Sequence, residues 1–264
     1  MGWQKRLHKR CLLNNLKFIQ YDSLGSTNAE ADRLSEGGEP APFWVRADIQ
    51  TEGRGRRGRD WVSPKGNFYG TAAYDFDGSP QDAAKLSFVA AISVAKALSA
   101  YTLTTAPSLK WPNDVLLGGR KVAGLLLEAK PGRVLIGIGV NLVSHPDGGN
   151  IPATHLLEHM DPEALNSEEP EFTGAEGFLA ILAKAFDEAF RKHLAYGFSA
   201  TRADWTRLAS GLPGPVTVRL PKESFIGQAQ SLLENGALRV ALDDGTIRDV
   251  HAGDVFFGTE AGEP

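Results

Sequence analysis

Short apolar-rich stretches between polar segments predict three strands in the first part of the chain. Residues 43–49 show the two-residue alternation of a half-buried strand, and residues 17–21 and 67–76 are also expected to be strands. Residues 50–65, between the second and the third of these strands along the chain, are polar and rich in glycine. This segment is therefore expected to be a loop.

Apolar positions spaced three and four residues apart predict two helices in the same region. The first is expected to begin at Ser26 and Thr27, where Glu30 completes a capping box with Thr27, and to end at the glycine pair 37–38. The second is expected to begin at the Ser-Pro pair 79–80, because proline suits the first helical position. Its apolar stripe consists of Leu86, Val89, Ala90, Val94 and Ala97.

Short apolar runs follow, separated by glycine-containing turns at residues 118–119 and 131–132. Two adjacent β-hairpins are the simplest interpretation of this pattern. Because hairpins join antiparallel strands, the sheet is expected to be mixed or antiparallel and not doubly wound, which makes the fold α+β with helices packed on the sheet. The strands predicted here are residues 108–110, 115–117, 122–130 and 133–142.

The second half of the chain changes pattern twice. Residues 145–174 are rich in proline and acidic residues, which predicts a long surface excursion, and two amphipathic helices are expected at 173–196 and 201–208. From Pro213 onward only short strands and glycine turns remain, as in a small all-β barrel of the SH3-like size class. The expected parts are an N-terminal extension (1–16), a main domain (17–210) and a small β domain (211–264).

Composition excludes several classes of protein. Among the 264 residues, 42% are hydrophobic and 23% are charged, as in a folded globular chain. The net charge of −4 gives no general attraction to nucleic acid or to an anionic membrane. We find no apolar run long enough for a membrane span and no signal peptide. A single cysteine, Cys11, cannot form an intramolecular disulfide, so we expect a cytoplasmic protein.

Residues 53–59, GRGRRGR, form a segment that we name the arginine loop. Glycine lets the backbone approach a ligand closely, and arginine binds phosphate with two hydrogen bonds, so this loop suits a triphosphate or an adenylate. Trp61 just beyond it is a candidate apolar lid. A solvated basic segment, or one that contacts RNA, is the competing interpretation. The chain contains no Walker A motif.

A second group of polar residues lies in KWPND (110–114) and RKVAG (120–124). The hairpin between them is expected to bring Lys121 and Gly124 alongside Lys110, Asn113 and Asp114. A lysine can neutralise a carboxylate and a phosphoryl oxygen together, while an aspartate can orient the lysine or hold magnesium. Taken singly, each lysine is more readily interpreted as a surface residue, and it is their grouping that favours a site.

Two further motifs carry less information. GIGVN (137–141) places glycines inside a strand and Asn141 at its end, which indicates close backbone approach or simply a buried strand. His155, Glu158 and His159 match a zinc-protease pattern that requires a long helix. Prolines on both sides leave room for about two turns, so we expect no metal ligands from this motif.

Together, in this order, these motifs resemble those of the biotin protein ligases, from about residue 17 to the C-terminus. The resemblance implies the class II synthetase-like fold of the biotin and lipoate ligases with a small C-terminal SH3-like β-barrel. The matching segments are GSTN (25–28), QTEGRGRRGRDWVSPKGNFY (50–69), KWPND, GRKVAGLLLE (119–128), GIGVN, GQAQSLLENGALRVALDDG (227–245) and HAGDVFF (251–257).

The activity that this resemblance implies has two steps. Biotin and ATP form biotinyl-5′-AMP with Mg²⁺, and the biotinyl group then passes to a lysine of a biotin carboxyl carrier protein. Lys121, Arg56 and Asp114 would be catalytic, with Asp114 as a tentative base for the second step. The implied binding residues are Ser26, Thr27 and Gln50 for the ureido ring, Asn113 and Asn141 for the nucleotide, and Asn28, Gly53, Arg54, Gly55, Arg56, Arg57, Gly58, Trp61, Lys110, Lys121 and Gly124.

The chain also departs from the family pattern. Glu52 stands where the family usually has a small residue, and it is expected to pair with Arg54 or to weaken retention of the adenylate. Repressor members begin with a winged-helix domain, which needs about 60 residues. Only residues 1–16 precede the first predicted strand here, so operator binding is not expected. The expected partners are carrier proteins, with no DNA or membrane and with a homodimer as an open alternative. Rival interpretations are a lipoate protein ligase and a nucleic-acid-binding module.

Overall fold

The structure is a computed structural model that describes residues 7–13, 16–147, 152–165 and 171–258. Its main part is an eight-stranded sheet in the order β1-β2-β3-β4-β8-β7-β6-β5. Only β2 and β3 pair in parallel among the strand neighbours of this sheet. The mixed sheet confirms the predicted α+β class. Its strands are β1 (Leu7–Leu13), β2 (Leu16–Leu24), β3 (Phe43–Gln50), β4 (Phe68–Asp75), β5 (Ser108–Lys110), β6 (Asp114–Leu117), β7 (Arg120–Lys130) and β8 (Arg133–Val140).

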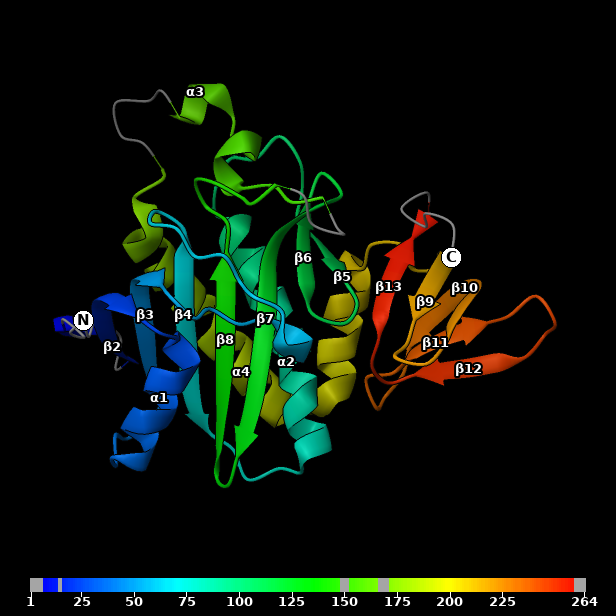
Figure 1. The fold of residues 1–264 in the computed structure, drawn as a ribbon, viewed down its shortest axis with the longest axis horizontal. Coiled ribbons are helices and arrows are strands. Elements are labelled where there is room, and N and C mark those ends of the chain that lie inside the picture. The colour runs from blue at the N-terminus through cyan, green and yellow to red at the C-terminus, as the bar shows by residue number, and fades with distance from the viewer. Residues whose placement is uncertain (1–6, 14–15, 148–151, 166–170, 259–264) are drawn as a thin grey trace.

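Helices cover both faces of this sheet (Figure 1). Helix α1 (Thr27–Glu36) connects the parallel strands β2 and β3 and packs on one face, while α2 (Pro80–Leu98) and α4 (Gly174–Leu208) pack on the other. Gly197 interrupts α4 with a φ of 70° and a ψ of −175°, which confirms the prediction of two helices in this segment. Shorter helical turns are η1 (Arg56–Gly58), η2 (Leu156–His159) and α3 (Pro162–Leu165). In the part of the chain that the structure describes, no helix is both long enough and apolar enough to cross a membrane.

Successive residues of the central strands point to opposite faces and so build two cores. Phe18 and Trp44 face α2 and α4, whereas their neighbours Ile19 and Val45 face α1. The larger core is rich in aromatic rings: Phe186 of α4 is fully buried between Trp44, Tyr74 and Phe190, with ring centroids 5.8, 5.1 and 5.9 Å away. This packing fixes α4 on the sheet.

Replacing Phe186 with alanine is expected to destabilise the protein by about 3–5 kcal/mol, because it removes a buried ring and leaves a cavity among three others. Chemical denaturation of the variant and of the parent measures this difference. Leu194→Ala is the matched control, since Leu194 lies on the same helix with an exposed side chain. A loss below 1 kcal/mol for Phe186→Ala would contradict the packing described here.

One strand of the main part was not predicted, and two expectations about this part were wrong. Strand β1 was not predicted, because residues 1–16 were assigned to an extension; it pairs antiparallel with β2 at the sheet edge. The capping box does not form: Ser26 is the N-cap without a side-chain bond, and the Glu30 carboxylate instead accepts from the hydroxyl of Tyr21 and from Arg33. The 145–174 excursion is partly buried, since Thr154 and Leu156 are inaccessible to solvent.

The C-terminal strands form a separate five-stranded sheet in the order β12-β11-β10-β9-β13, which confirms the small SH3-like β domain. It lies beside the β5–β6 edge of the main sheet (Figure 1). Trp111 donates its indole N–H to the carbonyl of Gly236 across this junction at 3.1 Å. The exact boundary at residue 211 stays a prediction. The strands are β9 (Gly214–Arg219), β10 (Ser224–Leu232), β11 (Leu238–Ala241), β12 (Ile247–Val250) and β13 (Asp254–Phe257).

Candidate active site

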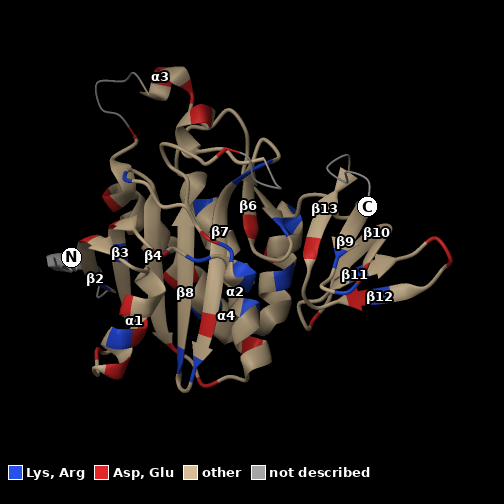
Figure 2. Ribbon diagram, viewed as in Figure 1, with Lys and Arg blue, Asp and Glu red and all other residues tan. Residues whose placement is uncertain are grey.

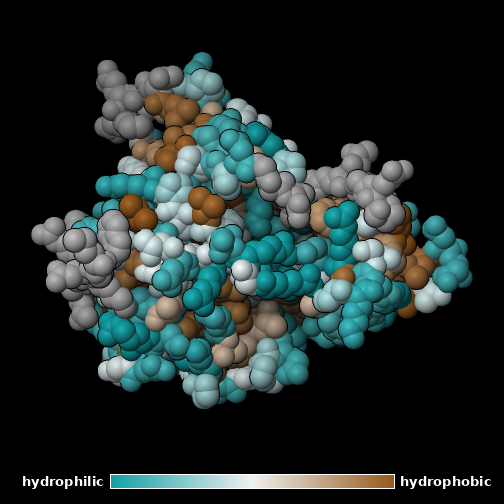
Figure 3. Space-filling view, viewed as in Figure 1, coloured by the Kyte–Doolittle hydropathy of each residue, from teal (hydrophilic) through white to brown (hydrophobic). Residues whose placement is uncertain are grey.

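A cleft of about 310 Å³ opens where the arginine loop crosses β7 and β8, next to β13 of the C-terminal sheet. Lys and Arg gather in this region of the ribbon, and the surface between the two sheets is a hydrophilic band (Figures 2 and 3). The volume suits a small molecule. Candidate residues that line it are Ser26, Thr27, Asn28, Gln50, Arg54, Gly55, Arg56, Arg57, Trp61, Lys110, Asn113, Asp114, Lys121, Gly124 and Asn141.

The floor of the cleft is a glycine surface on β7 and β8. A Cβ atom at Gly139 would lie 2.5 Å from the Trp61 ring, and one at Gly124 would lie 2.8 Å from it. A Cβ atom at Gly137 would lie 2.4 Å from Oδ1 of Asn28. Only glycine therefore lets these groups approach the sheet, which explains the glycines of the GIGVN motif. Trp61, the predicted lid, packs directly on this floor.

Neutral polar groups gather at one side of the cleft. The side-chain carbonyl of Gln50 accepts from the backbone N–H and the hydroxyl of Thr27, at 2.9 and 3.1 Å. Gln50 donates in turn to the hydroxyl of Ser63, and Thr71 donates to Oδ1 of Asn28 at 2.6 Å. Thr27, Asn28 and Gln50 line the cleft from α1 and β3 and offer both donors and acceptors to an uncharged polar ligand, while Ser63 and Thr71 support them without lining it.

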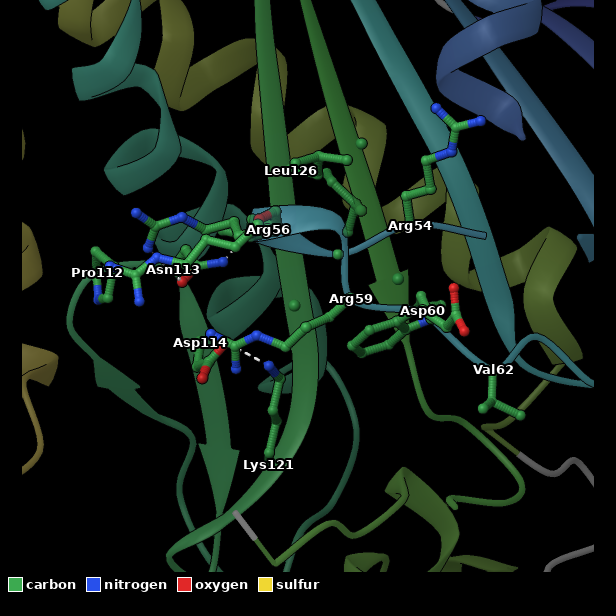
Figure 4. A pocket seen from close by; sticks show the side chains of 18 of the residues that line it. Arg54, Arg56, Arg59, Asp60, Val62, Pro112, Asn113, Asp114, Lys121 and Leu126 are labelled. Atoms are coloured by element: carbon green, nitrogen blue, oxygen red, sulfur yellow. Dashed lines mark hydrogen bonds and ion pairs between the residues drawn. The ribbon is translucent and has the colours of Figure 1, made fainter. Parts of the chain in front are cut away.

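Charged groups gather at the other side. Lys121 Nζ on β7 lies 2.6 Å from Asp114 Oδ1 on β6, and it stands over the Trp61 ring at 5.6 Å from the centroid. Arg56 donates to Oδ1 of Asn113 at 3.2 Å (Figure 4). Burial, with a smaller contribution from the neighbouring Arg57, lowers the pKa of Arg56. The hairpin predicted from KWPND and RKVAG thus does bring these residues together.

The C-terminal sheet contributes to the same cleft, although none of its residues was among the predicted site residues. Asp254 at the start of β13 forms ion pairs with Arg57 at 3.2 Å and with Arg59 at 2.6 Å. Phe256 on the same strand lies 5.5 Å from Lys110 Nζ, close enough for a cation–π contact. Arg57 has a φ of 57°, unusual for a residue other than glycine. A carboxylate nearly 200 residues away therefore fastens the arginine loop.

Some predicted residues lie differently from what was expected. Gly53 and Gly58 do not line the cleft; a Cβ atom at Gly53 would lie 2.5 Å from the Trp61 carbonyl, so this glycine sits beneath the loop. Asn141 lines the cleft, but its amide donates to the carbonyl of Thr154. Glu52 lies 4.0 Å from Arg54 with both side chains exposed, so this ion pair is weak. Lining residues that were not predicted include Arg59, Asp60, Val62, Trp111, Pro112, Leu125, Leu126, Gly137, Ile138, Gly139, Pro146, Ala153, Asp254, Val255 and Phe256.

Known proteins resemble this chain over both of its parts. Residues 22–143 match the model of the biotin/lipoate A/B protein ligase family, and residues 215–258 match that of the biotin protein ligase C-terminal domain. A biotin--[acetyl-CoA-carboxylase] ligase of Paracoccus denitrificans is 40% identical, over 88% of this chain and 97% of that protein. The bifunctional ligase/repressor BirA of Bacillus subtilis is 28% identical, over 91% of this chain and 74% of that protein.

Solved structures agree with these matches. The biotin protein ligase of Aquifex aeolicus in complex with biotin and ATP superposes with a TM-score of 0.75 at 26% identity, covering 91% of this chain and 99% of that chain. A biotin acetyl coenzyme A carboxylase synthetase of Helicobacter pylori with bound biotinylated ATP gives a TM-score of 0.54 at 24% identity, covering 88% of this chain and 98% of that chain. The matched domains, the fold and the 40% identity over nearly the whole chain show that this chain belongs to the biotin protein ligase family.

Proposed function

We propose that this chain activates biotin with ATP to biotinyl-5′-AMP and transfers the biotinyl group to a lysine of a biotin carboxyl carrier protein. One observation carries this function: a single cleft holds uncharged donors and acceptors around Thr27 and Gln50 and cations around Lys121 and Arg56. Biotin has a neutral ureido ring at one end and a carboxylate at the other. The cleft therefore offers each end of biotin the chemistry that it needs.

In the first step a biotin carboxylate oxygen forms a bond to the α-phosphorus of ATP, and the bond to pyrophosphate breaks. Both reactants are anions, so fixed cations must offset their repulsion. We assign Lys121 to the carboxylate and α-phosphate oxygens, and Arg54 and Arg56 to the phosphates. Asn113 orients Arg56 through the hydrogen bond between them.

Asp114 fits a magnesium ion that accompanies ATP, because its carboxylate lines the cleft and is an oxygen ligand of the kind that Mg²⁺ prefers. Bound there, the ion would neutralise charge on the phosphates. Asp114 is only 8% exposed and is held by Lys121. In the absence of the ion this pair keeps the lysine directed into the cleft.

In the second step the acceptor amine attacks the carbonyl carbon of biotinyl-5′-AMP. The new amide bond forms, AMP leaves, and the proton of the amine must be taken up. We assign Asp114 as the base, since it is a carboxylate beside the reacting group that Lys121 holds. The enzyme needs no nucleophile of its own, because the mixed anhydride is already activated.

A transfer assay tests this function directly. The purified chain, ATP, Mg²⁺ and biotin are incubated with a recombinant biotin carboxyl carrier domain, and the mass of the carrier is measured. We expect one biotinyl group on one lysine and one AMP released for each biotin transferred. A carrier whose acceptor lysine is changed to arginine is the control. Absence of the mass increase under these conditions would contradict the proposal.

Asp254→Ala is expected to raise the KM for ATP about two- to fivefold, because ion pairs of partly exposed groups contribute up to about 1 kcal/mol and two of them hold the loop. Steady-state kinetics with varied ATP measures the effect. Asp249→Ala is the matched control: Asp249 pairs with Arg239 on the same sheet and does not line the cleft. A lower KM for ATP in Asp254→Ala would show that Asp254 competes with phosphate instead of fastening the loop.

The remaining expectations belong to the same proposal. We propose that the protein works in the cytoplasm without binding DNA, and the −4 net charge supports the second point. The nucleic-acid interpretation of the arginine loop predicts tight RNA binding with a steep salt dependence. A homodimer stays an alternative to the monomer that size measurements in solution distinguish.

A further inference from the structure

His145, His155 and Glu158 form a cluster outside the residues assigned to biotin and ATP. Their ligand atoms all lie within 4.8 Å of one another. The motif that matched a zinc-protease pattern contributes only two of them. η2 is a single turn, and it turns His159 away to a contact with the hydroxyl of Thr154 at 2.8 Å. His145, from the segment after β8, takes the third position.

The distances within this cluster fit one tetrahedral metal ion. Nδ1 of His145 lies 2.9 Å from Nδ1 of His155, and Oε1 of Glu158 lies 3.6 and 3.4 Å from these two atoms. Ligands about 2.0–2.1 Å from a tetrahedral zinc ion are about 3.3–3.4 Å apart. The three separations lie around that value, so one ion can reach all three atoms with only small side-chain shifts.

Glu158 is already oriented for such a role. Its other oxygen, Oε2, accepts from Arg120 and from the hydroxyl of Thr154, each at 2.7 Å, which leaves Oε1 directed at the two imidazoles. Outer partners of this kind commonly fix a metal-binding carboxylate. The geometry of these three side chains alone therefore presents one carboxylate oxygen and two ring nitrogens to a common point.

The cluster is also accessible. The side chains of His145 and His155 are 19% and 18% exposed, and that of Glu158 is 31% exposed. An ion from solution can therefore reach the site, and a water molecule can complete the tetrahedron. Two histidines and one carboxylate with an open fourth position are a donor set that zinc accepts in proteins.

We propose that His145, His155 and Glu158 bind one divalent transition-metal ion and that this ion is zinc. The ion links the segment after β8 to the segment that borders Lys121. That second segment pairs with β7: the Lys121 N–H donates to the carbonyl of Pro152, and the Thr154 N–H donates to the carbonyl of Lys121. The metal thus stabilises the wall of the cleft without touching the reacting groups.

The test uses the full chain without a histidine tag, first treated with a chelator and then dialysed against zinc or cobalt. We expect one zinc per chain, the visible absorption of tetrahedral Co²⁺, and a higher Tm when zinc is present. His145→Gln and His155→Gln should each weaken binding at least tenfold. Glu158→Gln should also weaken zinc binding, because it removes the carboxylate ligand while the neighbouring Arg120 and Thr154 are unchanged.

His251→Ala is the matched control, because His251 is an exposed histidine in the turn between β12 and β13. Unfolding curves in chelator verify that each variant folds. The proposal is overturned if the parent chain holds no zinc, if His145→Gln and His155→Gln retain it, or if His251→Ala loses it equally. If the parent chain holds no zinc, the contact between the two imidazoles is only a hydrogen bond.

Discussion

Lys121→Ala is expected to lower biotin-dependent exchange of labelled pyrophosphate into ATP by a factor of about 10²–10³, the size of effect seen when one fixed charge-stabilising group is removed from an active site. The Nζ atom of Lys121 is held in the cleft by Asp114 and by the Trp61 ring, at the position where the proposed function places the two anions. The Lys121 side chain is 24% exposed, so its truncation to alanine removes little packing from the core.

Lys130→Ala is the control for this prediction. Lys130 lies on the same strand and also forms an ion pair, with Asp32, but far from the cleft residues. Because Lys121→Ala leaves Asp114 without its cation, thermal unfolding of the variant and of the parent checks that lost exchange does not come from lost folding. Exchange within a few-fold of the parent in Lys121→Ala would contradict the role assigned to this lysine.

Arg56→Gly is expected to release biotinyl-5′-AMP into solution and to label lysines of a bystander protein at least tenfold more than the parent chain does. Arg56 is the loop arginine that reaches Asn113, and a guanidinium binds phosphate through paired hydrogen bonds. Glycine removes both contacts and frees the backbone of the loop. Labelling of serum albumin added to the reaction, followed with streptavidin, measures the escape.

Two further variants sharpen that experiment. Arg33→Ala, on α1 and outside the cleft, should label no more than the parent does. Arg56→Lys keeps the charge but not the fork of donors, so it should fall between the parent and Arg56→Gly. Labelling restricted to the carrier protein in Arg56→Gly would mean that other groups retain the adenylate.

Local patterns predicted most of the main sheet, because each strand and hairpin there carries its own period and turn residues. The turns at 118–119 and 131–132 join β6 to β7 and β7 to β8 as expected. Strand β1 was missed since its sequence, LHKRCLL, groups the polar residues instead of alternating them, and only pairing with β2 makes it a strand. The capping box failed because other groups bind the Glu30 carboxylate: Tyr21 from strand β2 and Arg33 from the next turn of the same helix.

The residues of the cleft also fall into two groups, those that local sequence predicts and those that it does not. Lys121 and Asp114 were predictable because a short hairpin brings them together. Asp254 and Phe256 were not, since only the docking of the C-terminal sheet places them opposite the arginine loop. His145 and His155 are ten residues apart, and their contact depends on the path of a segment with no regular pattern. Long-range docking and irregular segments therefore account for what the sequence did not predict.

The central claim is that this cleft activates biotin, and exchange of labelled pyrophosphate into ATP tests it most directly. Biotin, lipoate and octanoate are each supplied as the only acid, with the parent chain and with Lys121→Ala. We predict exchange with biotin alone, because only the ureido ring pairs the polar groups around Thr27 and Gln50. Exchange with lipoate or octanoate instead of biotin, or with none of the three acids, would contradict the account.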